Sequence, residues 1–337
     1  MVFDTGLNQI DDALAMALLY GFEGKGEAFV VAVSVSRPAL DGAIFCDVVS
    51  RFYAGTASGG NAVNGRKLPV GLADAGPLTQ GDAPFVEGPL ARRNDQGKPL
   101  YVSDIHRAKD TAEPTALLRN AFTAQFDGNA VVVLSGPATT LASLLDVAGA
   151  KALITRKVRF LVIAGGALPN GDPEFNIKAD IPASRKLFAE WPTPIVMCGH
   201  EVGAQLLYPG ASIEQDFAWS SAHPVVDAYR ANQPMPYDAP TTAMAAVLYA
   251  AHPQDEYFTL SEPGTVSISD DGRTRFVASA SGRHRYLVLD PAQKDRIIKV
   301  YRDVASAKPV QRVQPRRPPP AAPPKKAPEP EEPAPEQ

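Results

Sequence analysis

The chain has 337 residues, of which 45% are hydrophobic and 21% are charged, and its formal net charge is −4. This length allows one large or two ordinary domains with a substantial core. The weak negative charge gives no basic surface for nucleic acid or an anionic membrane. Because no run approaches the roughly 18 apolar residues that a membrane span needs, a small-molecule ligand is the simplest expectation.

The chain begins MVFDTGLNQIDDALAMALLY, a short apolar start followed by a helical pattern over 13–19. Asp11 and Asp12 lie where the helix begins. Acidic residues in a first helical turn are favoured by about 0.3–1 kcal/mol each, so the pair is either a helix start or part of an active site. The short start suggests a longer natural N-terminus. We expect a cytoplasmic protein as written, or an exported one if a signal peptide is missing.

Strand and helix patterns then alternate along the chain. Continuously apolar strands separated by helices are typical of a parallel sheet covered on both faces. We therefore predict an α/β three-layer sandwich with a central, mostly parallel sheet. Cys46 and Cys198 lie in apolar surroundings and are expected to be buried thiols. The strands are expected at 28–36, 128–136, 158–166 and 193–199, and the helices at 41–53, 114–126, 139–154 and 182–191.

The C-terminal third follows a different pattern. The segment 264–279 alternates apolar and polar residues around Asp-Asp-Gly, which predicts a β-hairpin, and a helix is expected over 291–307. The remaining Pro-rich segment lacks aromatic residues and should be a disordered tail. The expected organisation is one domain over 1–307 and a tail over 308–337, which is either inert or a weak docking segment for a partner protein.

Polar and small residues follow several of the predicted strands. The loops are DTGLNQIDD, SRPALDG, SGPATT and GGALPNGDPEFN. Ligands of open α/β sheets bind beyond the carboxyl ends of the strands, so these loops are the candidate site. Ordinary turn chemistry explains any one of them equally well.

Taken together, FDTGLNQIDDALAMAL, VVVLSGPATTLASLL, VRFLVIAGGALPNGDPEFNIKAD, AAVLYAAHP and LSEPGTVSISDDGRTRF resemble the inosine-uridine-preferring nucleoside hydrolase family in order and content. The resemblance covers about residues 2–305. It implies cleavage of the N-glycosidic bond of ribonucleosides to ribose and free base, with a calcium ion that holds the ribose hydroxyls and the attacking water. A homo-oligomer is a further expectation from the resemblance.

The resemblance also implies roles for individual residues. Asp11 matches the general base, and Asp12 matches a calcium ligand. Ser135 matches a position whose backbone carbonyl binds the metal. Glu174 and Asn176 match residues that bind the ribose hydroxyls.

Two expected calcium ligands are replaced in this chain. Gly6 and Ala243 stand where the family has aspartates, and Asp238 is a substitute ligand only if its segment is rearranged. Arg37 lies near the place of a ribose-binding Asn. We therefore expect weakened calcium binding, because affinity depends on the number of carboxylates. Three hypotheses stay open, namely an active N-ribohydrolase, a catalytically inactive protein that binds nucleoside or ribose, and a scaffold protein.

Overall fold

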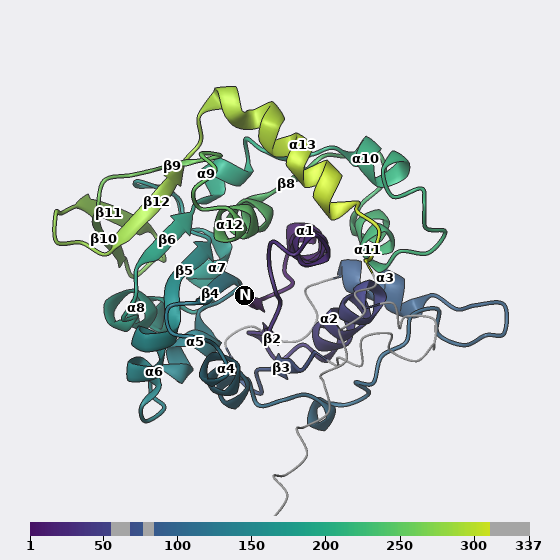
Figure 1. The fold of residues 1–337 in the computed structure, drawn as a ribbon, viewed down its shortest axis with the longest axis horizontal. Helices are drawn as coiled ribbons and strands as arrows, with labels where there is room; N and C mark the ends of the chain where they lie inside the picture. The colour runs from purple at the N-terminus through teal and green to yellow at the C-terminus, as the bar shows by residue number, and fades with distance from the viewer. Residues whose placement is uncertain (55–67, 77–83, 311–337) are drawn as a thin grey trace, which may run out of the picture.

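The computed structural model describes residues 1–54, 68–76 and 84–310 (Figure 1). The strands are β1 (Val2–Thr5), β2 (Ala32–Val35), β3 (Val70–Leu72), β4 (Ala130–Ser135), β5 (Val158–Ala164), β6 (Ile195–Cys198), β7 (Leu207–Tyr208), β8 (Ala239–Pro240), β9 (Thr259–Leu260), β10 (Gly264–Ile268), β11 (Thr274–Ala278) and β12 (His284–Val288). The α-helices are α1 (Ile10–Lys25), α2 (Leu40–Tyr53), α3 (Pro84–Ala91), α4 (Pro114–Thr123), α5 (Thr139–Leu144), α6 (Ala150–Lys157), α7 (Phe175–Ala179), α8 (Ile181–Glu190), α9 (His200–Gly203), α10 (Gly210–Gln215), α11 (Pro224–Asn232), α12 (Thr242–Ala251) and α13 (Lys294–Ala305). Two short 3₁₀ helices are η1 (Ala108–Asp110) and η2 (Pro291–Gln293).

Within the described ranges, one ten-stranded sheet has the order β11-β10-β12-β6-β5-β4-β1-β2-β3, with β9 beside β12. The strands from β12 to β3 pair in parallel, whereas β9, β10 and β11 pair antiparallel. The strand order reverses between β1 and β4, which creates the crevice where open α/β sheets bind ligands.

Helices cover both faces of this sheet (Figure 1). On one face, Phe3 of β1 and Val133 of β4 pack with residues of α1 and α12 in one core cluster. On the other face, the neighbouring Val2 and Val132 pack with residues of α4, α5 and α8. This alternation follows from the period of two along a strand. The predicted three-layer α/β sandwich is confirmed.

Helix α1 is buried almost throughout. All residues from Ile10 to Phe22 are buried, including Asp11 and Asp12. It is enclosed by α12, α13 and α11, which explains its nearly continuous apolar sequence. Its central position brings the two carboxylates into the interior of the protein.

Most predicted elements are confirmed, with one correction. The helix predicted over 139–154 is wrong as a single element, because α5 ends at Leu144 and α6 begins at Ala150. Gly149, the residue before α6, has a φ of +78°, which lies outside helical geometry. The C-terminal hairpin and helix are present as β10–β11 and α13. Cys46 and Cys198 are buried free thiols.

Two further expectations concern membrane spans and the C-terminal tail. None of the helices in the described part is both long and apolar enough to cross a bilayer. From residue 311 on, the predicted tail lies outside the described residues.

Candidate functional site

A small cavity lies at the carboxyl edge of the sheet. Its wall is formed by the loop after β1, the first turn of α1, the ends of β4 and β5, the start of α7 with the residue before it, and the first residues of α9 and α12. Its volume of about 10 Å³ is roughly the space of one water molecule. The sequence-predicted residues that line it are Asp11, Asp12, Ser135, Glu174 and Asn176.

Asp11 is bound to the beginning of another helix. Its carboxylate accepts hydrogen bonds from the backbone N–H groups of Ala243 at 2.5 Å and Met244 at 3.2 Å. Asp11 thus caps α12, where unpaired N–H groups and the helix dipole favour negative charge. Burial raises the pKa of Asp11 well above its ordinary value, and the charge of Asp12 raises it further, while the amides oppose both effects.

Asp12 instead caps its own helix. Its Oδ2 accepts hydrogen bonds from the N–H groups of Asn8 at 2.9 Å and Gln9 at 3.4 Å. Burial raises the pKa of Asp12 to about 7, and the Ser135 hydroxyl and the Arg37 charge act against this effect. The two adjacent carboxylates therefore cap two different helices, α12 and α1, whose first turns meet at the cavity wall.

Glu174 and Asn176 organise the loop that follows β5. The Glu174 carboxylate accepts hydrogen bonds from the backbone of Gly166 at 2.9 Å and of Asn176 at 3.0 Å, and it caps α7. The Asn176 side chain donates to the Ala164 carbonyl at 3.0 Å. Burial raises the pKa of Glu174. Both side chains line the cavity while they hold its wall in place.

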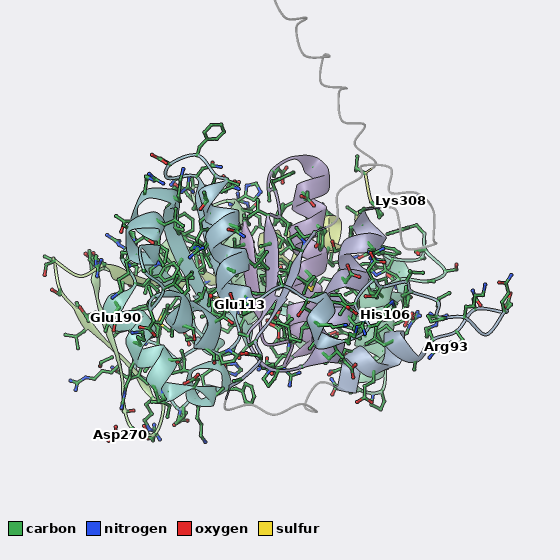
Figure 2. All side chains as sticks on the ribbon, turned by 90° about the horizontal axis from the view of Figure 1, so that it is seen from below. Arg93, His106, Glu113, Glu190, Asp270 and Lys308 are labelled. Atoms are coloured by element: carbon green, nitrogen blue, oxygen red, sulfur yellow. The ribbon has the colours of Figure 1, made fainter. Side chains whose placement is uncertain are left out.

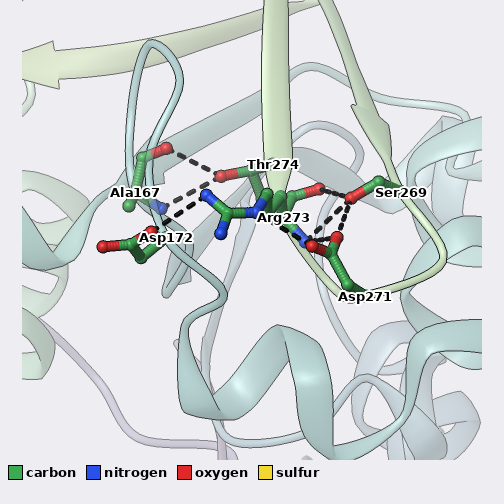
Figure 3. A network of polar contacts seen from close by, with 6 residues as sticks. All are labelled: Ala167, Asp172, Ser269, Asp271, Arg273 and Thr274. Atoms are coloured by element: carbon green, nitrogen blue, oxygen red, sulfur yellow. Dashed lines mark hydrogen bonds and ion pairs between the residues drawn. The ribbon is translucent and has the colours of Figure 1, made fainter.

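The β10–β11 hairpin clamps this loop from outside (Figure 3). Thr274 Oγ1 donates to the Ala167 carbonyl at 2.8 Å and accepts from the Ala167 N–H at 3.0 Å. Arg273 pairs with Asp172 at 2.9 Å and also with Asp271 on the hairpin turn. The C-terminal hairpin therefore positions the loop that carries Glu174.

Asp238 lies elsewhere. Its Oδ1 accepts a hydrogen bond from Gly210 N–H at 2.8 Å, and it is not among the residues that line the cavity. Ala243 occupies the cavity wall instead. The carbonyl of Ser135, expected at a metal, accepts a hydrogen bond from Gly6 N–H at 3.1 Å.

These residues do not fit calcium. The ion takes six to eight oxygen ligands, usually with several carboxylates. At this cavity Asp11 and Asp12 are both engaged with backbone amides, and Gly6 and Ala243 supply no side-chain oxygen. Over residues 1–54, 68–76 and 84–310, no group of three or more His, Cys, Asp or Glu side chains could hold a metal ion.

Sequence reasoning missed His200, the first residue of α9, which lines the cavity and whose charge lowers the pKa of Glu174 against the larger effect of burial. The sequence offers no paired metal-ligand spacing around this His, which predicts an ordinary surface or loop residue. Its position directly after the strand predicted over 193–199 was the available signal, because strand ends line the ligand crevice.

The fold and site define a doubly wound α/β protein with a carboxyl-lined cavity at its topological switch point. A sequence profile described as inosine-uridine preferring nucleoside hydrolase matches residues 1–310. The chain belongs to this family.

Solved structures share the fold at low sequence identity. A plant nucleoside hydrolase has a TM-score of 0.66 and 18% identity, with 91% of this chain and 98% of that chain covered. The inosine-uridine preferring nucleoside hydrolase from Bacillus anthracis has a TM-score of 0.65 and 15% identity, with 90% and 98% covered. The purine-preferring ribonucleoside hydrolase from Gardnerella vaginalis has a TM-score of 0.64 and 17% identity, also with 90% and 98% covered. No curated protein matches the sequence.

Proposed function

We propose that the protein is a nucleoside N-ribohydrolase, which binds a ribonucleoside at the cavity and hydrolyses the bond between ribose and base. The match to the nucleoside hydrolase family over residues 1–310 carries this proposal. The convergence of Asp11, Asp12 and Glu174 on one cavity supports it. Cleavage of a glycosidic bond passes through a cation-like sugar, which buried carboxylates stabilise.

In this proposal Asp11 is the general base. Water adds to the anomeric carbon of ribose and loses a proton to Asp11, while the bond to the base breaks. The base takes up a proton from solvent as it leaves, and Asp11 then releases its proton to solvent, so that water and nucleoside yield ribose and free base. Asn176 and Glu174, which both line the cavity, bind the ribose hydroxyls in this proposal. Because the cavity holds about one water molecule, the rim must open to admit the sugar.

The donor set argues against a calcium-activated water. Without a metal, the pKa of the attacking water stays near 15.7, and Asp11 must remove the proton unaided. We expect slow turnover that does not depend on calcium.

The second candidate is a protein that binds nucleoside or ribose without turnover. It is favoured by the engagement of Asp11 with two amides of α12, because each of the two carboxylate oxygens already accepts a hydrogen bond from the backbone. The scaffold hypothesis concerns the tail, which from residue 311 lies outside the described residues.

The deciding experiment incubates the purified protein with inosine, uridine, adenosine, guanosine and cytidine, once with calcium and once with a chelator. Free base is measured by chromatography and nucleoside binding by calorimetry. Asp11→Asn is the test variant, and Asp95→Asn, in an exposed loop, is the control.

Base release in chelator that disappears in Asp11→Asn and persists in Asp95→Asn supports the hydrolase. Binding without base release supports the second candidate. Neither binding nor release with any of these nucleosides overturns both.

A further inference from the structure

The loop between β1 and α1 is strained at Leu7 and buried at Gly6 and Leu7. Leu7 has a φ of +48°, in the left-handed region that side-chain-bearing residues rarely adopt, and its side chain is fully buried. Such a conformation persists only where the surroundings enforce it. The loop must therefore be held by specific contacts.

The loop's N–H groups are held by contacts within the protein. Gly6 N–H donates to the Ser135 carbonyl at 3.1 Å, and Leu7 N–H donates to Thr5 Oγ1 at 3.1 Å. The next two N–H groups donate to Asp12, as described above. These contacts leave the carbonyls of Gly6 and Leu7 to be satisfied.

Arg37 supplies the donors for both carbonyls. Its Nε donates to the Gly6 carbonyl at 2.6 Å, and its Nη2 donates to the Leu7 carbonyl at 3.3 Å. The side chain is buried, with 2% of its surface exposed. A buried guanidinium bound to backbone carbonyls is a positive charge with fixed geometry.

This charge also lies close enough to Asp12 to attract it. Arg37 lowers the pKa of the Asp12 carboxyl, although burial is the larger effect. Arg37 thus has three functions that a bound metal ion can have beside buried carboxylates. It binds backbone oxygens, balances a buried carboxylate and fixes a strained loop.

We infer that Arg37 is the resident cation of this site and positions the β1–α1 loop, so that the Asp11–Asp12 pair is organised without a divalent metal. Arg37 does not itself line the cavity. Its guanidinium binds the carbonyl oxygens of Gly6 and Leu7 in the loop that leads to Asp11 and Asp12, and its positive charge disfavours a second cation nearby. The inference concerns the architecture of the site and holds for a hydrolase and for a binding protein alike.

The first test uses the full-length chain without a ligand. Thermal unfolding is followed in chelator and in calcium up to about 1 mM, the range of weak calcium modules. We expect the same Tm in both conditions. A calcium-dependent rise in Tm of the unmodified protein would overturn the inference, whatever the outcome of the nucleoside assays.

The second test compares Arg37→Met with Arg93→Met by hydrogen exchange of residues 5–12. Arg93 also donates to backbone carbonyls but lies exposed at the base of a protruding segment (Figure 2). We expect faster exchange in Arg37→Met and unchanged exchange in Arg93→Met. Equal exchange in the two variants would contradict a positioning role.

Two further readouts separate a resident cation from ordinary packing. Arg37→Met removes the positive charge and leaves the carbonyls of Gly6 and Leu7 unsatisfied. We expect it to have a lower Tm, by the same amount in chelator and in calcium, because Gly6 and Ala243 still supply no carboxylate. Arg37→Lys keeps the charge but not the two-pronged geometry of the guanidinium, and we expect it to recover part of the exchange protection. Exchange in Arg37→Lys as fast as in Arg37→Met would contradict a role for the charge. Arg37→Lys also replaces the Met variant in the exchange test if that variant does not fold.

Discussion

Asp4, in the middle of β1, is a carboxyl group that the fold keeps fully buried. Neither of its oxygens has a hydrogen bond of good geometry. Burial raises its pKa from 3.8 to about 8, against the smaller effects of the hydroxyls of Ser34 and Ser36. Since the folded state binds the proton more tightly than the unfolded state, the protein loses stability as the pH rises from about 4 to 8.

We therefore expect Asp4→Asn to flatten this dependence. Relative to the unmodified protein, the variant should gain up to about 1.4 kcal/mol of unfolding free energy per pH unit over this range. Urea titrations at several pH values measure the slope, with Asp95→Asn in an exposed loop as the control. A constant difference between Asp4→Asn and the unmodified protein at all pH values would refute the argument.

His223 gives stability the opposite dependence on pH from that of Asp4. It is buried among aromatic rings, with Phe52 and Phe217 at centroid distances of 4.4 and 4.9 Å, and its Nδ1 accepts from Val225 N–H at 3.3 Å. Burial lowers its pKa from 6.5 to about 3. The unfolded state takes up a proton first as the pH falls, so stability present above pH 6.5 is lost on the way to pH 3, by about 1.4 kcal/mol per unit at most.

His223→Asn keeps a side-chain acceptor at this N-cap but has no titrating ring. We expect the variant to be less stable at pH 7, because packing is lost, and to lose less stability than the unmodified protein between pH 6.5 and 4. Unfolding free energies measured at both ends of this interval test the expectation. His106→Asn, at an exposed position, serves as the control, and parallel curves for His223→Asn and His106→Asn would speak against it.

At the scale of elements, the hydroxyl of Thr274 makes two of the hydrogen bonds by which the β10–β11 hairpin holds the loop after β5. Thr274→Val removes the bonds to both backbone groups of Ala167 and keeps the shape of the side chain. Leaving buried polar groups unpaired costs about 1–3 kcal/mol. We expect this loss in urea unfolding and faster hydrogen exchange over residues 165–174. Thr265→Val, exposed on the same hairpin, should change neither quantity.

The parallel strands were predictable because they are buried on both faces and are therefore continuously apolar. Asp11, Ser135 and Glu174 were predictable as cavity residues because strand ends meet at one edge of the sheet. What Asp11 contacts was not predictable, since its partner Ala243 lies 232 residues away in sequence. The burial of Arg37 and its contacts with the β1–α1 loop were not predictable either, because no local pattern tells whether an arginine after a strand points inward.

For the whole molecule, both core clusters are built from residues up to Ala305. Helix α13 closes one of them by crossing α1 at Gly21, where a Cβ atom would come within 2.1 Å of the Val304 carbonyl oxygen. The composition of 311–337 offers no aromatic residue to add to either cluster. The stability of the domain should therefore depend on α13 and not on the segment that follows it.

A chain that ends at residue 310 should unfold with the same Tm and the same cooperativity as the full chain. A chain that ends at residue 293 loses Ile297, Tyr301 and Val304 from the core. Since a fully buried large apolar side chain contributes about 1.5–3 kcal/mol, this deletion removes an amount comparable to the whole stability of a typical domain. Circular dichroism melts of the three chains make the comparison, and a Tm several degrees lower for the chain ending at 310 would show that the segment after it stabilises the domain.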